Sequence, residues 1–160
     1  MKHTRFLVLI TLAFASVMAT SSSPDPMIFV SASPCDPVAR HYLDIPKDFD
    51  CEMIKWRLSL YKDPRNQSPT RFELSYTYGM TKPGTEGFMN GGFAKELKGK
   101  WTATKSTSQR AGSHVYQLIP DSRPGTISFL KLDENVLHLL DLKGNFMIGN
   151  AGFSYTMNKL

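Results

Sequence analysis

The sequence predicts an all-β protein, a small antiparallel up-and-down β-barrel of about eight strands with little helix. From residue 51 onward, apolar and polar residues alternate with a period of two, which is typical of strands with one buried face. Turn-forming residues separate these segments at short, regular intervals. No helical pattern competes after residue 50. Consecutive hairpins need no long crossings, which favours a barrel over a sandwich.

Residues 1–19 have the pattern of a secretory signal peptide. Basic residues precede an apolar run from Phe6 to Ala19, and Val17 and Ala19 occupy the third-last and last positions before a cleavage site. A membrane-spanning helix needs about 20 apolar residues, and this run is shorter. We therefore expect an exported protein, located in the periplasm, the cell envelope or outside the cell. We expect no transmembrane segment after removal of the signal.

The expected mature chain has a flexible leader over residues 20–26 and a single barrel domain over residues 27–160. A first strand is expected at residues 27–32. The segment 34–50 holds three prolines and reads as a connection, with a short helical turn at residues 38–43.

The clearest element is a long hairpin in which two alternating segments flank a polar turn rich in Asp, Asn and Pro. The residues expected to share one core are Ile54, Trp56, Leu58, Leu60, Phe72, Leu74 and Tyr76. The residues expected to face solvent are Lys55, Arg57, Glu73 and Ser75.

The glycine-rich connection over residues 79–92 follows this hairpin, and we expect it to cross the barrel as a loop with one hydrophobic plug, Phe88 or Met89. The remaining strands are expected at residues 97–104, 115–119, 127–132, 136–140, 145–148 and 153–157.

Charge and motif content exclude several functions. The net charge of +5 falls to +3 once Lys2 and Arg5 are removed, and the basic residues form no run, which disfavours nucleic-acid binding. No Gly-x-Ser-x-Gly elbow is present, and His138 lies within a strand pattern. The candidate carboxylates for acid–base chemistry, Asp133 with Glu134 or Asp141, lie in predicted hairpin turns, where Asp commonly makes local hydrogen bonds. We therefore expect no catalytic residues, no cofactor and no enzymatic activity.

Cys35 and Cys51 allow three interpretations. Two cysteines in an exported chain fit a disulfide, which we expect. They are alternatively two free thiols, or ligands of a soft metal such as Cu(I), for which His41 is the nearby imidazole. The chain has no Cys-x-x-Cys, His-x-His or Met-x-x-Met, so we expect no bound metal.

Much of the chain from Cys51 onward resembles the N-terminal barrel domain of the copper-resistance lipoprotein NlpE and related small Bacteroidetes envelope proteins. The segments that carry the resemblance are Cys51–Tyr61, Phe72–Tyr76, Gly99–Thr102, Ile127–Leu132 and Leu137–Asp141. In that family, a Cys-x-x-Cys precedes the first long strand. Here Cys51 matches its second cysteine, whereas Cys35 lies further upstream and the lipid-attachment cysteine is missing. The resemblance implies a small barrel and a role in envelope stress or copper resistance.

We therefore expect a non-enzymatic envelope protein that binds an unknown protein partner. The alternative is a lipocalin-like carrier that holds a small apolar ligand inside the barrel. Small barrels are either filled by their own side chains or hold one ligand. The large inward residues of the predicted hairpin favour a filled interior.

Overall fold

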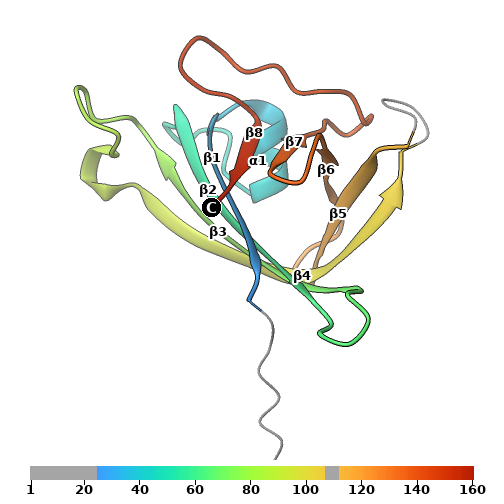
Figure 1. The fold of residues 1–160 in the computed structure, drawn as a ribbon. Helices are drawn as coiled ribbons and strands as arrows, with labels where there is room; N and C mark the ends of the chain where they lie inside the picture. The colour runs from blue at the N-terminus through green and yellow to red at the C-terminus, as the bar shows by residue number, and fades with distance from the viewer. Residues whose placement is uncertain (1–24, 107–111) are drawn as a thin grey trace, which may run out of the picture.

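The computed structural model describes residues 25–106 and 112–160, in which eight strands form a closed antiparallel barrel (Figure 1). Each strand pairs with the next one along the chain, and the last closes on the first, so the predicted up-and-down barrel is confirmed. The predicted signal peptide, residues 1–19, lies outside the described residues, as does most of the predicted leader.

The strands are β1 (Met27–Pro34), β2 (Met53–Lys62), β3 (Pro69–Gly79), β4 (Phe93–Lys105), β5 (His114–Pro120), β6 (Ile127–Lys131), β7 (Val136–Leu139) and β8 (Thr156–Lys159). The helix α1 (Pro37–Leu43) joins β1 to β2, and the 3-10 turn η1 (Met89–Gly91) lies between β3 and β4.

The predicted hairpin is β2 paired with β3, in a register that places Leu58 opposite Leu74 and Leu60 opposite Phe72. All seven residues expected in its core are buried. Arg57 and Ser75 are exposed, and Lys55 and Glu73 are partly exposed. The predicted inward face is therefore correct, and it follows from the alternation of side chains along a strand.

The two neighbours of strand β4 pair with different halves of it. It pairs with β3 over residues 93–100 and with β5 over residues 99–105. Where the two halves meet, Gly99 lies opposite both Phe72 and Pro120. A Cβ atom at Gly99 would lie 2.9 Å from Phe72 Cε1 and would collide with the carbonyl oxygen of Ile119. Glycine thus permits the close approach of three strands at this point.

The strand predicted at residues 145–148 does not form, and the closing strand begins later than predicted. Only a single bridge, Leu140 with Phe146, pairs in this segment. The reason is local hydrogen bonding. Asp141 Oδ1 accepts from the backbone N–H groups of Lys143 and Asn145, both at 2.8 Å, and Asn150 makes a similar turn further along. Side chains of Asp and Asn here bond backbone groups that a ladder would otherwise use.

Helix α1 covers one end of the barrel, which we call the α1 end (Figure 1). Asp36 caps its first turn through a 2.8 Å bond from Ala39 N–H, and Pro37 occupies the first position, where a missing N–H costs nothing. Asp44 ends the helix in the left-handed conformation. The helical turn predicted at 38–43 is thus a complete short helix, and it buries Ala39, Tyr42 and Leu43.

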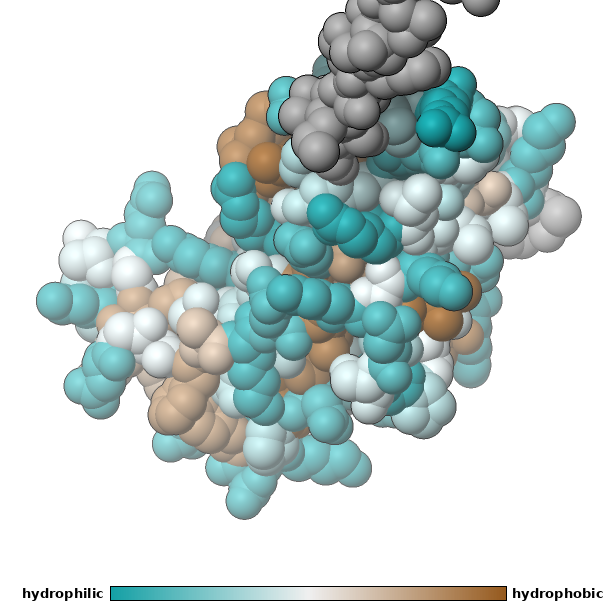
Figure 2. All heavy atoms as spheres, turned by 90° about the horizontal axis from the view of Figure 1, so that it is seen from below, coloured by the Kyte–Doolittle hydropathy of each residue, from teal (hydrophilic) through white to brown (hydrophobic). Residues whose placement is uncertain are grey.

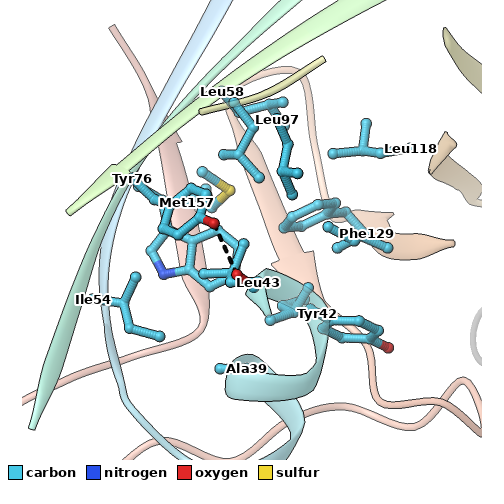
Figure 3. Packing of buried hydrophobic residues seen from close by; sticks show 14 of the residues in the cluster. Ala39, Tyr42, Leu43, Ile54, Leu58, Tyr76, Leu97, Leu118, Phe129 and Met157 are labelled. Carbon is cyan, nitrogen blue, oxygen red and sulfur yellow. Dashed lines mark hydrogen bonds between the residues drawn. The ribbon is translucent and has the colours of Figure 1, made fainter. Parts of the chain in front are cut away.

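The main core is one cluster that joins the buried face of α1 to the inner faces of the strands (Figure 3). In Figure 3, Leu43 and Ala39 lie beside Ile54 and Tyr76, while Phe129 and Leu118 continue the cluster away from the helix. The helix is therefore part of the hydrophobic core rather than an external appendage.

Candidate binding site

The barrel interior is filled by its own side chains. The central space between Trp56, Phe129, Tyr155 and Met157 is too small to admit a water molecule. The indole Nε1 of Trp56 donates a 2.8 Å bond to the Ser33 hydroxyl, whereas the buried Tyr155 hydroxyl has no hydrogen-bond partner among the described residues. This packing agrees with the filled interior expected from the sequence.

Two tyrosine hydroxyls fasten α1 in place. Tyr42, on the helix, donates a 2.9 Å bond to the carbonyl oxygen of Leu140. Tyr76, on β3, donates a 2.8 Å bond to the carbonyl oxygen of Leu43. Desolvation by burial raises the pKa of both Tyr42 and Tyr76 to about 12, because the phenolate would be charged in an apolar setting.

The segment that carries α1 is closed at its base by Cys35 and Cys51. Their Cα atoms lie 5.7 Å apart and the pair has the arrangement of a disulfide. The Arg40 guanidinium binds the same closure, since it donates to the carbonyl oxygens of Cys35, Pro46, Phe49 and Cys51 at 2.7 to 3.3 Å. The arrangement therefore gives these cysteines a structural role. Sequence reasoning missed Arg40, because its partners are backbone carbonyls that only the folded loop brings together.

The histidines considered for chemistry are spread over the molecule. His41 lies on α1, and its carbonyl oxygen accepts a 2.7 Å bond from Arg123. His138 faces outward from β7, with its ring nitrogens 3.1 Å from Thr156 Oγ1 and 2.9 Å from the Met147 carbonyl oxygen. It thus anchors the β7–β8 connection. In the part of the chain that the structure describes, no three His, Cys, Asp or Glu side chains gather as a metal site would require.

The carboxylates considered for acid–base chemistry also have local partners. Asp141 is held by Asn145, whose backbone and side-chain hydrogen bonds lower the pKa of that carboxyl. Glu134 pairs with Lys131, and this ion pair likewise lowers the pKa of the Glu134 carboxyl. Both residues act within their own turns.

The α1 end carries a set of exposed apolar side chains, which we call the apolar rim. They lie on the β3–β4 and β7–β8 connections and at the start of β4, and both connections flank α1 in Figure 1. The rim residues are Met80, Met89, Phe93, Leu142, Phe146 and Ile148. Phe93 is 55% exposed and Ile148 is 89% exposed. Large apolar side chains exposed at the same end of the barrel make this end a candidate interaction surface.

The sequence analysis anticipated only part of this rim. The expected plug, Phe88, packs over Gly92 and Gly79 at the base of its loop. Met89 points outward instead, at 52% exposure. Helix α1 takes the role of the plug. The signal that could have revealed the rim is the low charge of residues 142–154, where Lys143 is the sole charged residue.

A cleft of about 740 Å³ lies beside α1 at the same end. It is formed by the outer side of the helix and the segment that follows it, with lining residues Pro37, Arg40, His41, Asp44, Ile45, Pro46 and Lys47. The cleft and the apolar rim together make the α1 end the candidate binding site. Among the described residues, no helix has the length and apolar character needed to cross a membrane.

The fold and this surface define a small closed β-barrel with a solid core and a helix-covered end. Comparisons with protein-family models, with curated proteins and with solved structures found no match for this chain.

Proposed function

We propose that the protein is a non-enzymatic, exported protein of the cell envelope that binds a protein partner at the α1 end. The apolar rim is the observation that carries this proposal. Its side chains are large, exposed and grouped at one end of a barrel whose interior is full. Partner-binding surfaces combine such apolar residues with a polar margin, and His41, Asp44 and Lys47 of the neighbouring cleft supply that margin.

Export is supported by the N-terminal pattern and by the paired cysteines, because disulfides persist in oxidising compartments. The resemblance to the NlpE barrel domain suggests envelope stress or copper resistance as the setting. The carrier alternative finds no support in the filled interior. Among the described residues, no cluster of side chains is suited to hold a metal ion directly. In a copper-resistance role, we propose that the protein acts through its partner.

Site-specific photo-crosslinking in the native envelope tests this proposal. A photoreactive residue at Ile148 or Met89 should give one discrete crosslinked species. The matched control is the same residue at Arg65, an exposed position in the β2–β3 turn at the other end of the barrel. The crosslink from Met89 should be lost when Ile148→Asp is also introduced. Equal crosslinking from Arg65, or no effect of Ile148→Asp, would contradict partner binding at the rim.

A further inference from the structure

The basic residues of this chain concentrate on three strands and their connections. Residues 53–105 contain ten basic and four acidic residues, a net charge of +6, which exceeds the +5 of the whole sequence. These residues form β2, β3, β4 and the loops between them. Figure 2 views the molecule from below, where hydrophilic side chains cover much of the surface and hydrophobic atoms appear in patches between them and at the margin.

Two of the acidic residues on this outer face are already neutralised. Glu73 pairs with Arg71 at 3.0 Å, and Glu96 pairs with Lys98 at 2.9 Å. The positive charge of Arg57 and the ammonium groups of Lys55 and Lys100 have no carboxylate partner among the described residues. The face therefore keeps a positive potential that is not cancelled locally.

A shallow hollow of about 260 Å³ lies on this face, on the part of β2, β3 and β4 nearer the α1 end. Strand register explains it. Lys55 on β2 lies opposite Thr77 on β3, and Arg57 lies opposite Ser75. Next to Thr77, β4 places Ala94, whose small side chain leaves the space open.

The floor of the hollow is made of hydrogen-bond donors. Residues directly opposite on paired strands have Cβ atoms about 5 Å apart, so the Lys55 ammonium, the Arg57 guanidinium and two hydroxyls lie close together. Lys95 on β4 also lines the hollow. Among the described residues, the hydroxyls of Ser75 and Thr77 make no recorded hydrogen bond to another side chain or to the backbone. The buried rings of Trp56 and Tyr76, which also border the space, point into the barrel. Guanidinium and ammonium groups with adjacent hydroxyls suit a sulfate, phosphate or carboxylate group.

We propose that this hollow binds the charged groups of an acidic polysaccharide. Lys100 continues the positive surface along β4, beyond the Lys98–Glu96 ion pair, so that a further charged group of the same chain meets another unpaired cation. An anionic membrane fits less well, because the side chains facing the hollow include no large apolar group to insert between lipids. A nucleic acid fits less well, because no exposed aromatic ring faces the hollow for a base to stack on. The hollow borders the apolar rim, since Ala94 follows Phe93 and Lys55 Nζ lies 6.0 Å from the centroid of the Phe88 ring, but its lining side chains are different ones.

Binding of dextran sulfate and polygalacturonate to the full-length protein, with neutral dextran as reference, tests the proposal. We expect both acidic chains to bind, and their affinity to fall as salt rises. The double variant Lys55→Glu/Arg57→Glu should lose about tenfold or more in affinity, a change of about 1.4 kcal/mol. The matched control is Arg65→Glu/Lys159→Glu, which makes the same change of charge at exposed positions in the β2–β3 turn and on β8, outside the hollow. The control should change affinity by less than about twofold, since salt screens distant charges.

A second variant separates a shaped site from simple charge. Ala94→Leu fills the hollow without altering any charge, and Ala94 is exposed, so the fold should tolerate it. We expect it to weaken binding, while Arg57→Lys retains most of it. Equal losses from both charge-reversal pairs would overturn the proposal in favour of non-specific attraction. Unchanged binding in Ala94→Leu would overturn the hollow as the site. Binding to anionic vesicles but to neither polysaccharide would overturn the ligand class.

Discussion

The hydroxyl of Tyr76 in β3 donates a 2.8 Å hydrogen bond to the carbonyl oxygen of Leu43 at the end of α1 (Figure 3). This bond joins two segments 33 residues apart in sequence. It satisfies a helix carbonyl that has no partner within the helix. Together with the bond from Tyr42 to Leu140, it fixes the helix between the β3 wall and the end of β7. The position of the candidate binding site therefore depends on two phenol groups.

Replacing Tyr76 with Phe should reduce the free energy of unfolding by about 1–3 kcal/mol, because the Leu43 carbonyl oxygen would remain buried without its donor. The ring stays in place, so the packing of the core should change little. Urea unfolding followed by far-UV circular dichroism measures the effect. Tyr61→Phe is the control, since Tyr61 is only partly buried and bonds the partly exposed Glu73. Equal stability of Tyr76→Phe and the unchanged protein would contradict this assignment.

Stability should fall in alkaline solution. The pKa values of Tyr42 and Tyr76 are raised from 10.0 to about 12 in the folded protein. Above pH 10 the unfolded chain loses these protons while the folded protein keeps them, so unfolding becomes more favourable as pH rises. We expect the loss from these two residues to occur between about pH 10 and 12. Burial also raises the pKa of Tyr155, so the loss continues at higher pH. Urea titrations across this range measure it, and the combined variant Tyr42→Phe/Tyr76→Phe should show a weaker dependence on pH.

Leu58→Ala tests the predicted inward face. Leu58 is fully buried and lies opposite Phe29 and Leu74 on the neighbouring strands. Removing its side chain leaves a cavity, and we expect a loss of about 2–5 kcal/mol. The control is Arg57→Ala, one residue away on the exposed face, which should change stability by less than about 0.5 kcal/mol. A similar loss from both variants would show that the two faces are not distinct.

The alternation around Leu58 predicts its environment correctly because the period of two is a local property of any strand with one buried face. The predicted barrel order succeeds for a related reason, since short turns pair each strand with its neighbour in sequence. The Asp141 and Asn150 turns show where such reasoning fails. Residues 145–148 have a plausible strand pattern, but side-chain oxygen atoms bond the nearby backbone and prevent a ladder.

The functional surfaces depend on contacts that are distant in sequence. Arg40 gains its role from carbonyl groups as far away in sequence as Cys51. Phe93 stays exposed in the rim, and β5 pairs only with residues 99–105 of β4, so Phe93 has no neighbour on that edge. The hollow of the basic face requires the register of β2, β3 and β4 together. No pattern along one segment contains that register, so the sequence shows the residues of the site without showing their arrangement.

The paired cysteines should be oxidised in the purified protein. Ellman titration of the unfolded, unreduced chain should detect no free thiol, and two thiols per chain would contradict the disulfide. Their sequence separation is 16 residues. A closed loop of that length should contribute about 3 kcal/mol through the entropy of the unfolded chain. Cys35→Ala/Cys51→Ala should lose about that amount, and adding a reductant should then leave the stability of this variant unchanged.

Gly99→Ala should be among the most destabilising single-methyl additions in this barrel. The Cβ atom would collide with the carbonyl oxygen of Ile119 and would lie 2.9 Å from both Phe72 Cε1 and Pro120 Cα. Backbone atoms cannot swing aside as a flexible side chain would, so β4 and β5 must separate at the point where β4 changes partner. Overpacking of this kind typically costs about 1–3 kcal/mol, and we expect the upper part of that range.

The matched control for this substitution is Gly152→Ala in the β7–β8 connection. There the nearest atom to the added Cβ is the Asn150 side-chain oxygen at 3.7 Å, an ordinary contact. It should change the free energy of unfolding by less than about 0.5 kcal/mol. Comparable unfolding midpoints for Gly99→Ala and Gly152→Ala would contradict the close approach at Gly99. A loss of unfolding free energy in Gly99→Ala alone, measured by urea unfolding, would show that the point where β3 and β5 both pair with β4 requires a residue without a side chain.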